Sequence, residues 1–178
     1  MTKNTQFKTL VNGWLKNKRH MITPSTYANF VLIAENHLIP YFGKRKIGSI
    51  TESDIQKYIL YLYEEGRLDK TGGLTVKTIR DIILVFRLSM EYAYKEKATE
   101  LLNWDLVEYP KENGTNRVVS LSKEEEQELI QCIYMHMKRK TAGILIALFT
   151  GVRIGELCGL QMKDISLSEN TISVDRTV

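Results

Sequence analysis

The chain has 178 residues, of which 26% are charged and 43% are hydrophobic, and its net charge is +4. This composition is typical of a globular protein and excludes a disordered chain, and the length fits one domain or two small ones. The longest apolar run, residues 143–149, is far shorter than the roughly 20 residues that span a bilayer, so we expect no membrane segment. The polar N-terminus and the wide spacing of Cys132 and Cys158 favour a cytoplasmic protein whose cysteines are small core residues.

The positive charge is unevenly distributed along the chain. Residues 1–108 hold 16 Lys and Arg against 12 Asp and Glu, whereas residues 109–178 hold 9 of each kind. A basic surface attracts the phosphates of nucleic acid because binding releases their counterions. Any contact with nucleic acid is therefore expected mainly in the first part of the chain.

Four helices with short connections are predicted for the first hundred residues. Apolar residues recur at helical spacing over residues 7–15, which indicates the first helix. Thr23 before Pro24 starts the second, because the hydroxyl caps free amides and proline gives up an amide that had no partner. We expect this helix to run to about Ile39, where Pro40 stops it.

A capping box of Thr51 and Asp54 predicts the start of the third helix, and Gly66 predicts its end. The fourth helix is expected from Thr75 to about Lys97. The inward-facing stripes of these two helices are Ile55, Tyr58, Ile59 and Leu62, and Ile79, Ile82, Ile83, Phe86 and Met90.

The stretch 109–119 contains proline, glycine and charge without periodicity, which predicts a linker and a domain boundary. Ser122 with Glu125 is a second capping box. Three helices and a β-hairpin are predicted beyond the linker, over residues 122–138, 141–150, 153–160 and 165–174, with Gly151 ending the second of these helices.

The fourth helix has a second, basic face. At 100° per residue, Lys77, Arg80 and Arg87 fall within one arc of about 80°, which could lie against phosphates. Glu91 near the end of this arc interrupts it. From periodicity alone, an ordinary solvated face is the stronger explanation, because most surface helices show such a pattern.

A polar arc on the second helix matches this basic face. Thr26, Asn29, Asn36 and His37 are short hydrogen-bonding residues of the kind that reach base edges in a major groove. Two such helices could hold a duplex together, although solvated faces remain the alternative here as well.

Arg153 and Glu156 are the two charged residues of the otherwise apolar segment 148–160. They are three residues apart, so Glu156 can hold the guanidinium in place, and a planar cation held by a carboxylate suits the two non-bridging oxygens of a phosphate. A structural ion pair is the alternative. The three histidines show no metal-ligand spacing with the cysteines, and no glycine-rich phosphate loop occurs, so no metal or nucleotide cofactor is predicted.

The sequence TGVRIGELCGL at residues 150–160, followed by Asp164, closely resembles the first arginine motif of the tyrosine recombinases, or phage integrases. One departure is Met162, where many members have tryptophan. The resemblance extends over nearly the whole chain and implies a mainly α fold: a SAM-like four-helix core-binding domain over 1–108, a linker over 109–119, and a catalytic domain, truncated after its N-terminal helices and first β-hairpin, over 120–178.

The resemblance also implies a function. Members of the family break and rejoin duplex DNA at specific sites through a 3′-phosphotyrosyl intermediate, without a metal or nucleotide cofactor. Arg153 resembles the arginine that contacts the scissile phosphate, and Glu156 resembles the acidic residue that supports it. The implied partners are duplex DNA, further copies of the protein in a tetramer on two DNA sites, and in some systems accessory DNA-bending proteins, in the cytoplasm at the nucleoid.

The family's remaining catalytic residues, including a His-x-x-Arg box and the nucleophilic tyrosine, lie well downstream of the first arginine. Few residues follow Arg153, and the last tyrosine, Tyr134, precedes it. We therefore expect this segment to supply DNA binding and one catalytic arginine without cleaving DNA itself. A non-catalytic DNA-binding module that regulates or competes for sites, and a helical protein-interaction domain without DNA affinity, are the alternatives.

Overall fold

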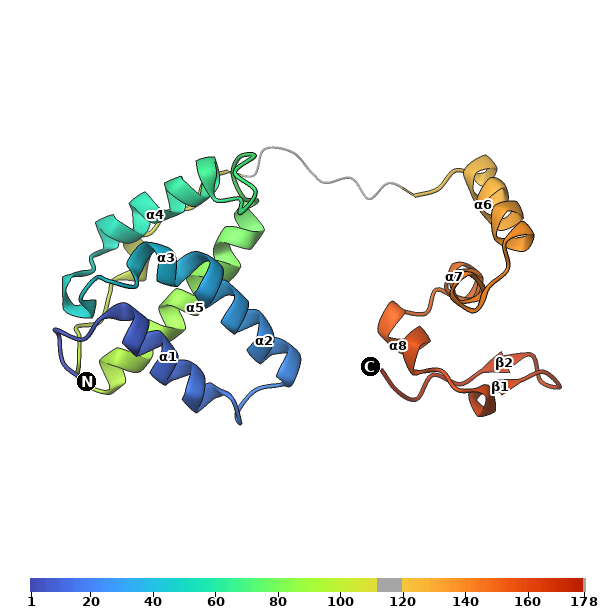
Figure 1. The fold of residues 1–178 in the computed structure, drawn as a ribbon, viewed down its shortest axis with the longest axis horizontal. Helices are drawn as coiled ribbons and strands as arrows, with labels where there is room; N and C mark the ends of the chain where they lie inside the picture. Colours follow the sequence, from blue (N-terminus) through green and yellow to red (C-terminus); the bar gives the residue numbers. More distant parts are fainter. Residues whose placement is uncertain (112–119, 178) are drawn as a thin grey trace. The chain divides into compact units, whose positions relative to one another are not determined.

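The computed structural model describes residues 1–111 and 120–177, and the chain is mainly helical, as predicted, with a short two-stranded sheet (Figure 1). It divides into two compact units, residues 1–115 and 116–178, which are treated separately below. Most of the predicted linker, residues 112–119, lies outside the described residues. Within the part of the chain that the structure describes, no helix has both the length and the apolarity to cross a bilayer.

The first unit begins with helix α1 (Phe7–Lys18), which buries the apolar face that the spacing predicted. Helix α2 (Pro24–Ile33) starts at the predicted cap. The Thr23 hydroxyl accepts a hydrogen bond from the backbone amide of Thr26, and Pro24 occupies the first helical position. The start of α2 is therefore set by local sequence.

The second helix does not stop at Pro40, and that prediction was wrong. The chain continues from α2 through a π-helical turn, η1 (Ala34–Leu38), into the short helix α3 (Ile39–Phe42). The amide of Ile39 donates to the carbonyl of Ala34, five residues back, so the helix is widened by one residue just before the proline. Proline then falls in the first turn of α3, where its missing amide is tolerated.

The bounds of helices α4 (Glu52–Glu65) and α5 (Val76–Lys95) lie close to the predicted ones. The capping box of α4 is present: the Thr51 amide donates to the Asp54 carboxylate at 3.0 Å, and the Asp54 amide donates to the Thr51 hydroxyl at 3.4 Å. Thr75 caps α5 through its hydroxyl. Two short 3₁₀ turns complete the unit, η2 (Ile47–Ser49) before α4 and η3 (Trp104–Leu106) after α5.

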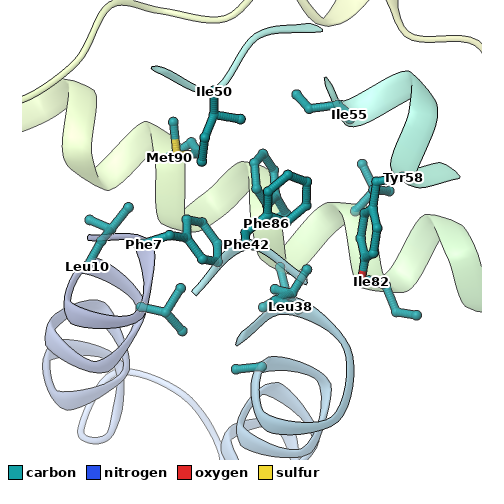
Figure 2. Close-up of a cluster of buried hydrophobic side chains, with 14 of the residues drawn as sticks. Phe7, Leu10, Leu38, Phe42, Ile50, Ile55, Tyr58, Ile82, Phe86 and Met90 are labelled. Atoms are coloured by element: carbon teal, nitrogen blue, oxygen red, sulfur yellow. The ribbon is translucent and has the colours of Figure 1, made fainter. Parts of the chain in front are cut away.

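Aromatic rings from several helices form the centre of the core of the first unit (Figure 2). Phe7, Phe42 and Phe86 are fully buried, and their ring centroids lie 4.9 to 5.7 Å apart. Tyr58 of α4 packs against Phe42, and its hydroxyl donates to the backbone carbonyl of His37 at 2.8 Å. Full burial of one such side chain contributes about 1.5–3 kcal/mol, so this cluster holds α1, α3, α4 and α5 together.

The second unit has the elements that the sequence predicted. Gly151 ends the second of its helices with a φ of 70°, a left-handed conformation that favours glycine. In the hairpin, Ile165 pairs with Ile172 in antiparallel register. The elements are α6 (Lys123–Met135), α7 (Arg139–Thr150), α8 (Ile154–Gly159), the 3₁₀ turn η4 (Met162–Asp164), β1 (Ile165–Ser166) and β2 (Thr171–Ile172).

Few apolar side chains of this second unit are buried. Ile133 is 4% exposed and is the only large apolar residue buried to that degree among the described residues of the unit. Phe149 is 65% exposed and Met162 is 83% exposed. The short helices here are therefore defined more by their caps and turns than by a shared core.

Candidate nucleic-acid interface

The basic face of α5, defined by Lys77, Arg80 and Arg87, is exposed to solvent. Arg87 donates from Nε to the Glu91 carboxylate at 2.8 Å, so Glu91 partly neutralises this face, as its position in the sequence indicated. Lys77 and Arg80 form no ion pair with any carboxylate in the described part of the chain. The face thus carries two cations without a carboxylate partner and one that is paired.

The residues after α5 return to pack on α4 and α5. This exit segment, residues 101–109, is fixed to α4 by hydrogen bonds to its backbone. The Glu52 carboxylate accepts from the amide of Asn103 at 2.8 Å, and the Gln56 side chain accepts from the amide of Glu108 at 2.9 Å and donates to its carbonyl at 3.1 Å. These contacts join residues that are about fifty positions apart in the sequence.

Two aromatic residues of the exit segment cover the arginines of the basic face. The guanidinium carbon of Arg80 lies 5.4 Å from the ring centroid of Tyr109, and that of Arg87 lies 5.4 Å from the ring centroid of Trp104. Burial raises the pKa of Tyr109, while the nearby arginines act in the opposite direction. The hollow between α5 and the exit segment has a volume of about 370 Å³ and is lined by Arg80, Asp81, Ile83, Leu84, Arg87, Trp104, Val107 and Tyr109.

The contribution of Trp104 and Tyr109 to this face was not predicted from the sequence. Tyr109 was assigned to the linker, and Trp104 lies in a stretch without periodicity. Two large aromatic residues shortly after a basic helix were the available signal, because such side chains rarely remain unpacked.

Only two of the four residues predicted for the polar face of the second helix lie on α2. Thr26 and Asn29 are exposed, and the Thr26 hydroxyl lies 2.8 Å from that of Thr23. Asn36 and His37 fall in the π turn η1, where side chains no longer keep the 100° spacing on which the arc was drawn. His37 is half-buried, and burial lowers its pKa. Among the described residues, no hydrogen bond or ion pair joins this polar face to the basic face of α5.

Arg153 occupies the N-cap position of α8, just after the left-handed Gly151, so it precedes the helix on which it was expected. Its Nη1 donates to Oε1 of Glu156 at 3.0 Å, and its backbone amide donates to Oε2 of the same carboxylate at 2.9 Å. The backbone hydrogen bond, and then the guanidinium, lower the pKa of Glu156. The Arg153 side chain is 85% exposed, so most of its N–H donors face solvent.

A partly buried ion pair in the second unit was not singled out from the sequence. Arg176 donates from Nη2 to the Asp164 carboxylate at 3.0 Å, and the Asp164 side chain is 7% exposed. The other carboxylate oxygen accepts from the amide of Gln161 at 2.8 Å. A Cβ atom at Gly159 would lie 3.0 Å from Cγ of Arg176, so glycine leaves room for this arginine beside α8. No periodicity links Asp164 to Arg176, so no sequence signal indicated the pair.

Cys132 and Cys158 are both exposed, so the prediction that they are core residues was wrong. The second unit buries too few side chains to cover them. Within residues 1–111 and 120–177, no three His, Cys, Asp or Glu side chains come together in a group that could hold a metal ion.

Comparison with protein families gives one match in the first unit. Residues 6–63 match the model of the phage integrase N-terminal SAM-like domain. The matched range covers α1 to α3 and most of α4.

Curated relatives extend the similarity along the chain. A XerC-like tyrosine recombinase of Caldanaerobacter subterraneus subsp. tengcongensis is 27% identical over 177 residues, which are 95% of this chain and 43% of the relative. The ICEBs1 integrase of Bacillus subtilis is 26% identical over 165 residues, which are 92% of this chain and 42% of that protein. The chain thus spans about two fifths of the length of these relatives.

Solved structures of the Tn1549 transposon integrase share the fold. One, in complex with circular intermediate DNA, has a TM-score of 0.62 at 21% identity and covers 94% of this chain and 54% of its own. A variant in complex with transposon right end DNA has a TM-score of 0.66 at 22% identity and covers 97% and 53%.

Proposed function

We propose that this chain is a member of the tyrosine recombinase, or phage integrase, family, and that it is the DNA-binding part of a site-specific recombinase together with its first catalytic arginine. Its first unit binds duplex DNA, and its second unit brings Arg153 to the phosphate at which a strand is exchanged. In this proposal, residues 1–108 form the DNA-binding domain, and residues 120–178 form the part of the catalytic domain that carries Arg153.

The observation that carries the catalytic part of the proposal is the geometry of Arg153 and Glu156. One carboxylate binds both the backbone amide and one edge of the guanidinium, at 2.9 and 3.0 Å, which fixes the direction of the side chain. The remaining donors are exposed and can form a bidentate contact with the non-bridging oxygens of a phosphate. A cation placed in this way stabilises the charge that develops on the phosphate in the transition state.

Cleavage itself requires a nucleophile from elsewhere. In the proposed reaction a tyrosine hydroxyl attacks the phosphorus, the bond to the 5′ oxygen breaks, and a 3′-phosphotyrosyl link and a free 5′-hydroxyl result. All nine tyrosines of this chain precede Arg153, whereas the family places its nucleophile well after the first arginine. We therefore expect the 178 residues to bind DNA without cleaving it, and the parent recombinase to work as a tetramer on two sites.

The DNA-binding part rests on the exposed basic face of α5, with Thr26 and Asn29 of α2 as candidates for contacts to base edges. The test is the affinity of the chain for a labelled duplex, measured by fluorescence anisotropy between 50 and 300 mM salt. We expect an affinity that falls steeply with salt, because phosphate contacts release counterions. Absent or salt-independent binding would exclude the proposed grip and would favour a protein-interaction domain.

The catalytic part is tested in a recombinase that contains this segment, with a nicked suicide substrate that traps the covalent intermediate. Arg153→Lys keeps the charge but removes the planar fork, so cleavage should fall by about 10²–10³-fold while DNA affinity stays close to wild type. Undiminished cleavage would remove Arg153 from the active site.

A further inference from the structure

Each arginine of the basic face lies against one aromatic ring of the exit segment. Tyr109 lies over Arg80 and Trp104 lies over Arg87, both at 5.4 Å from guanidinium carbon to ring centroid. Lys77, on the same face, has no such ring among the described residues. The two rings therefore contact only the arginines, and Lys77 can serve as the control cation of the same face, without an aromatic contact.

The rings are held in place by the folded unit. The Trp104 ring packs edge-on against the buried ring of Phe86, with 6.3 Å between centroids and an interplanar angle of 72°. The backbone beside Tyr109 is clamped by the two hydrogen bonds between Gln56 and Glu108. Each arginine thus meets a ring that is already positioned before any ligand arrives.

A cation–π contact with a ring does not occupy the N–H donors of a guanidinium with a hydrogen bond. Arg80 donates no hydrogen bond to another described residue, and Arg87 uses only its Nε, on Glu91, so contact with the rings restrains both side chains while their Nη donors stay available to a phosphate. A free arginine loses much of its rotamer freedom when it binds, and a restrained one loses less. We infer that Tyr109 and Trp104 are positioning residues that hold Arg80 and Arg87 ready for the phosphates of DNA, an inference that rests on the proposed DNA binding.

The direct test is Tyr109→Leu, which removes the ring and keeps an apolar side chain, measured in the full 178-residue chain by fluorescence anisotropy on a labelled duplex. We expect DNA affinity to fall about threefold, a size typical of an exposed cation–π contact. Tyr109→Phe keeps the ring and should restore the affinity. Thermal unfolding of each variant checks that the first unit remains folded.

A double-mutant cycle separates positioning from general packing. In an Arg80→Gln background, Tyr109→Leu should have no further effect on affinity, because the residue on which the ring acts is gone. In a Lys77→Gln background its effect should persist in full. A purely structural role predicts the same loss in both backgrounds, and that result would overturn the inference.

The inference can fail without the proposed function failing. If the wild-type chain binds DNA with a steep salt dependence and Tyr109→Leu binds equally well, DNA binding stands and the positioning role is wrong. If the wild-type chain does not bind DNA, both are wrong. Should Tyr109→Leu unfold the first unit, the cycle is carried out with Tyr109→Met, which also lacks a ring, and an effect that does not depend on Arg80 would contradict the inference.

Discussion

The two units of this chain are built on different physical principles. The first unit buries a continuous apolar cluster, in which Phe42 and Phe86 are fully enclosed. The second unit leaves Phe149 65% exposed and Ile154 74% exposed, and its helix ends are marked by capping boxes and a left-handed glycine. Tertiary packing therefore fixes the first unit, whereas local hydrogen bonds define most of what is seen in the second.

This difference matters for function because the two units present their cations in different ways. Arg80 and Arg87 are placed by long-range contacts with the exit segment. Arg153, the N-cap residue of α8, is placed by the carboxylate of Glu156 three residues later in that helix. The positions of Arg80 and Arg87 in the candidate DNA-binding face thus depend on the whole fold of the first unit. The position of the candidate catalytic arginine depends on a short stretch of sequence.

The largest difference between the two units should be the loss of stability when a phenylalanine is truncated to alanine. Phe42→Ala removes a fully buried ring and should lower the free energy of unfolding of the first unit by about 3–5 kcal/mol. Urea unfolding followed by tryptophan fluorescence measures this, because both tryptophans, Trp14 and Trp104, lie in the first unit. Phe149→Ala, at an exposed position, should change stability by less than about 0.5 kcal/mol, measured by circular dichroism. Equal losses at the two positions would contradict the comparison.

The capping boxes test whether local signals matter in both units. Thr51→Ala removes the hydroxyl that accepts the Asp54 amide and should lower the stability of the first unit by about 1 kcal/mol. Thr51→Ser keeps the acceptor and serves as the control. Ser122→Ala removes the equivalent cap of α6 and should lower the helical signal in circular dichroism. A helical signal unchanged by Ser122→Ala would show that the cap does not define α6.

Much of the fold could be predicted because its signals are local. The capping boxes and the stripe of α5 all lie within a few residues of the structure that they specify. The passage of the helix through Pro40 could not be predicted, because the π turn that accommodates the proline has no sequence rule. The aromatic cover on Arg80 and the partner of Asp164 were also missed, since both depend on contacts between distant residues.

The smallest expected effect is a dependence of the free energy of unfolding of the first unit on pH. Burial lowers the pKa of His37 below its ordinary value of 6.5, so the unfolded chain binds more protons than the folded one between these two values. The stability that results is fully present above pH 6.5 and is lost as the pH falls through 6.5 toward the lowered value. His37→Gln should flatten the fall in stability between pH 7.5 and 5, measured by urea unfolding with tryptophan fluorescence. His136 is exposed and lies in the second unit, so His136→Gln should leave this fall in stability unchanged. An equal flattening by both variants would rule out His37 as the source of the fall.

The central claim, that the first unit grips DNA through the basic face of α5, is tested most directly by removing that face. The variant Lys77→Gln/Arg80→Gln/Arg87→Gln is compared with Lys8→Gln/Lys16→Gln/Arg19→Gln, which removes three exposed charges from the first unit at and beside α1. The slope of log affinity against log salt should become shallower by about 0.9 for each phosphate that the protein no longer binds, and only in the α5 variant. Equal slopes for the two variants would contradict the claim.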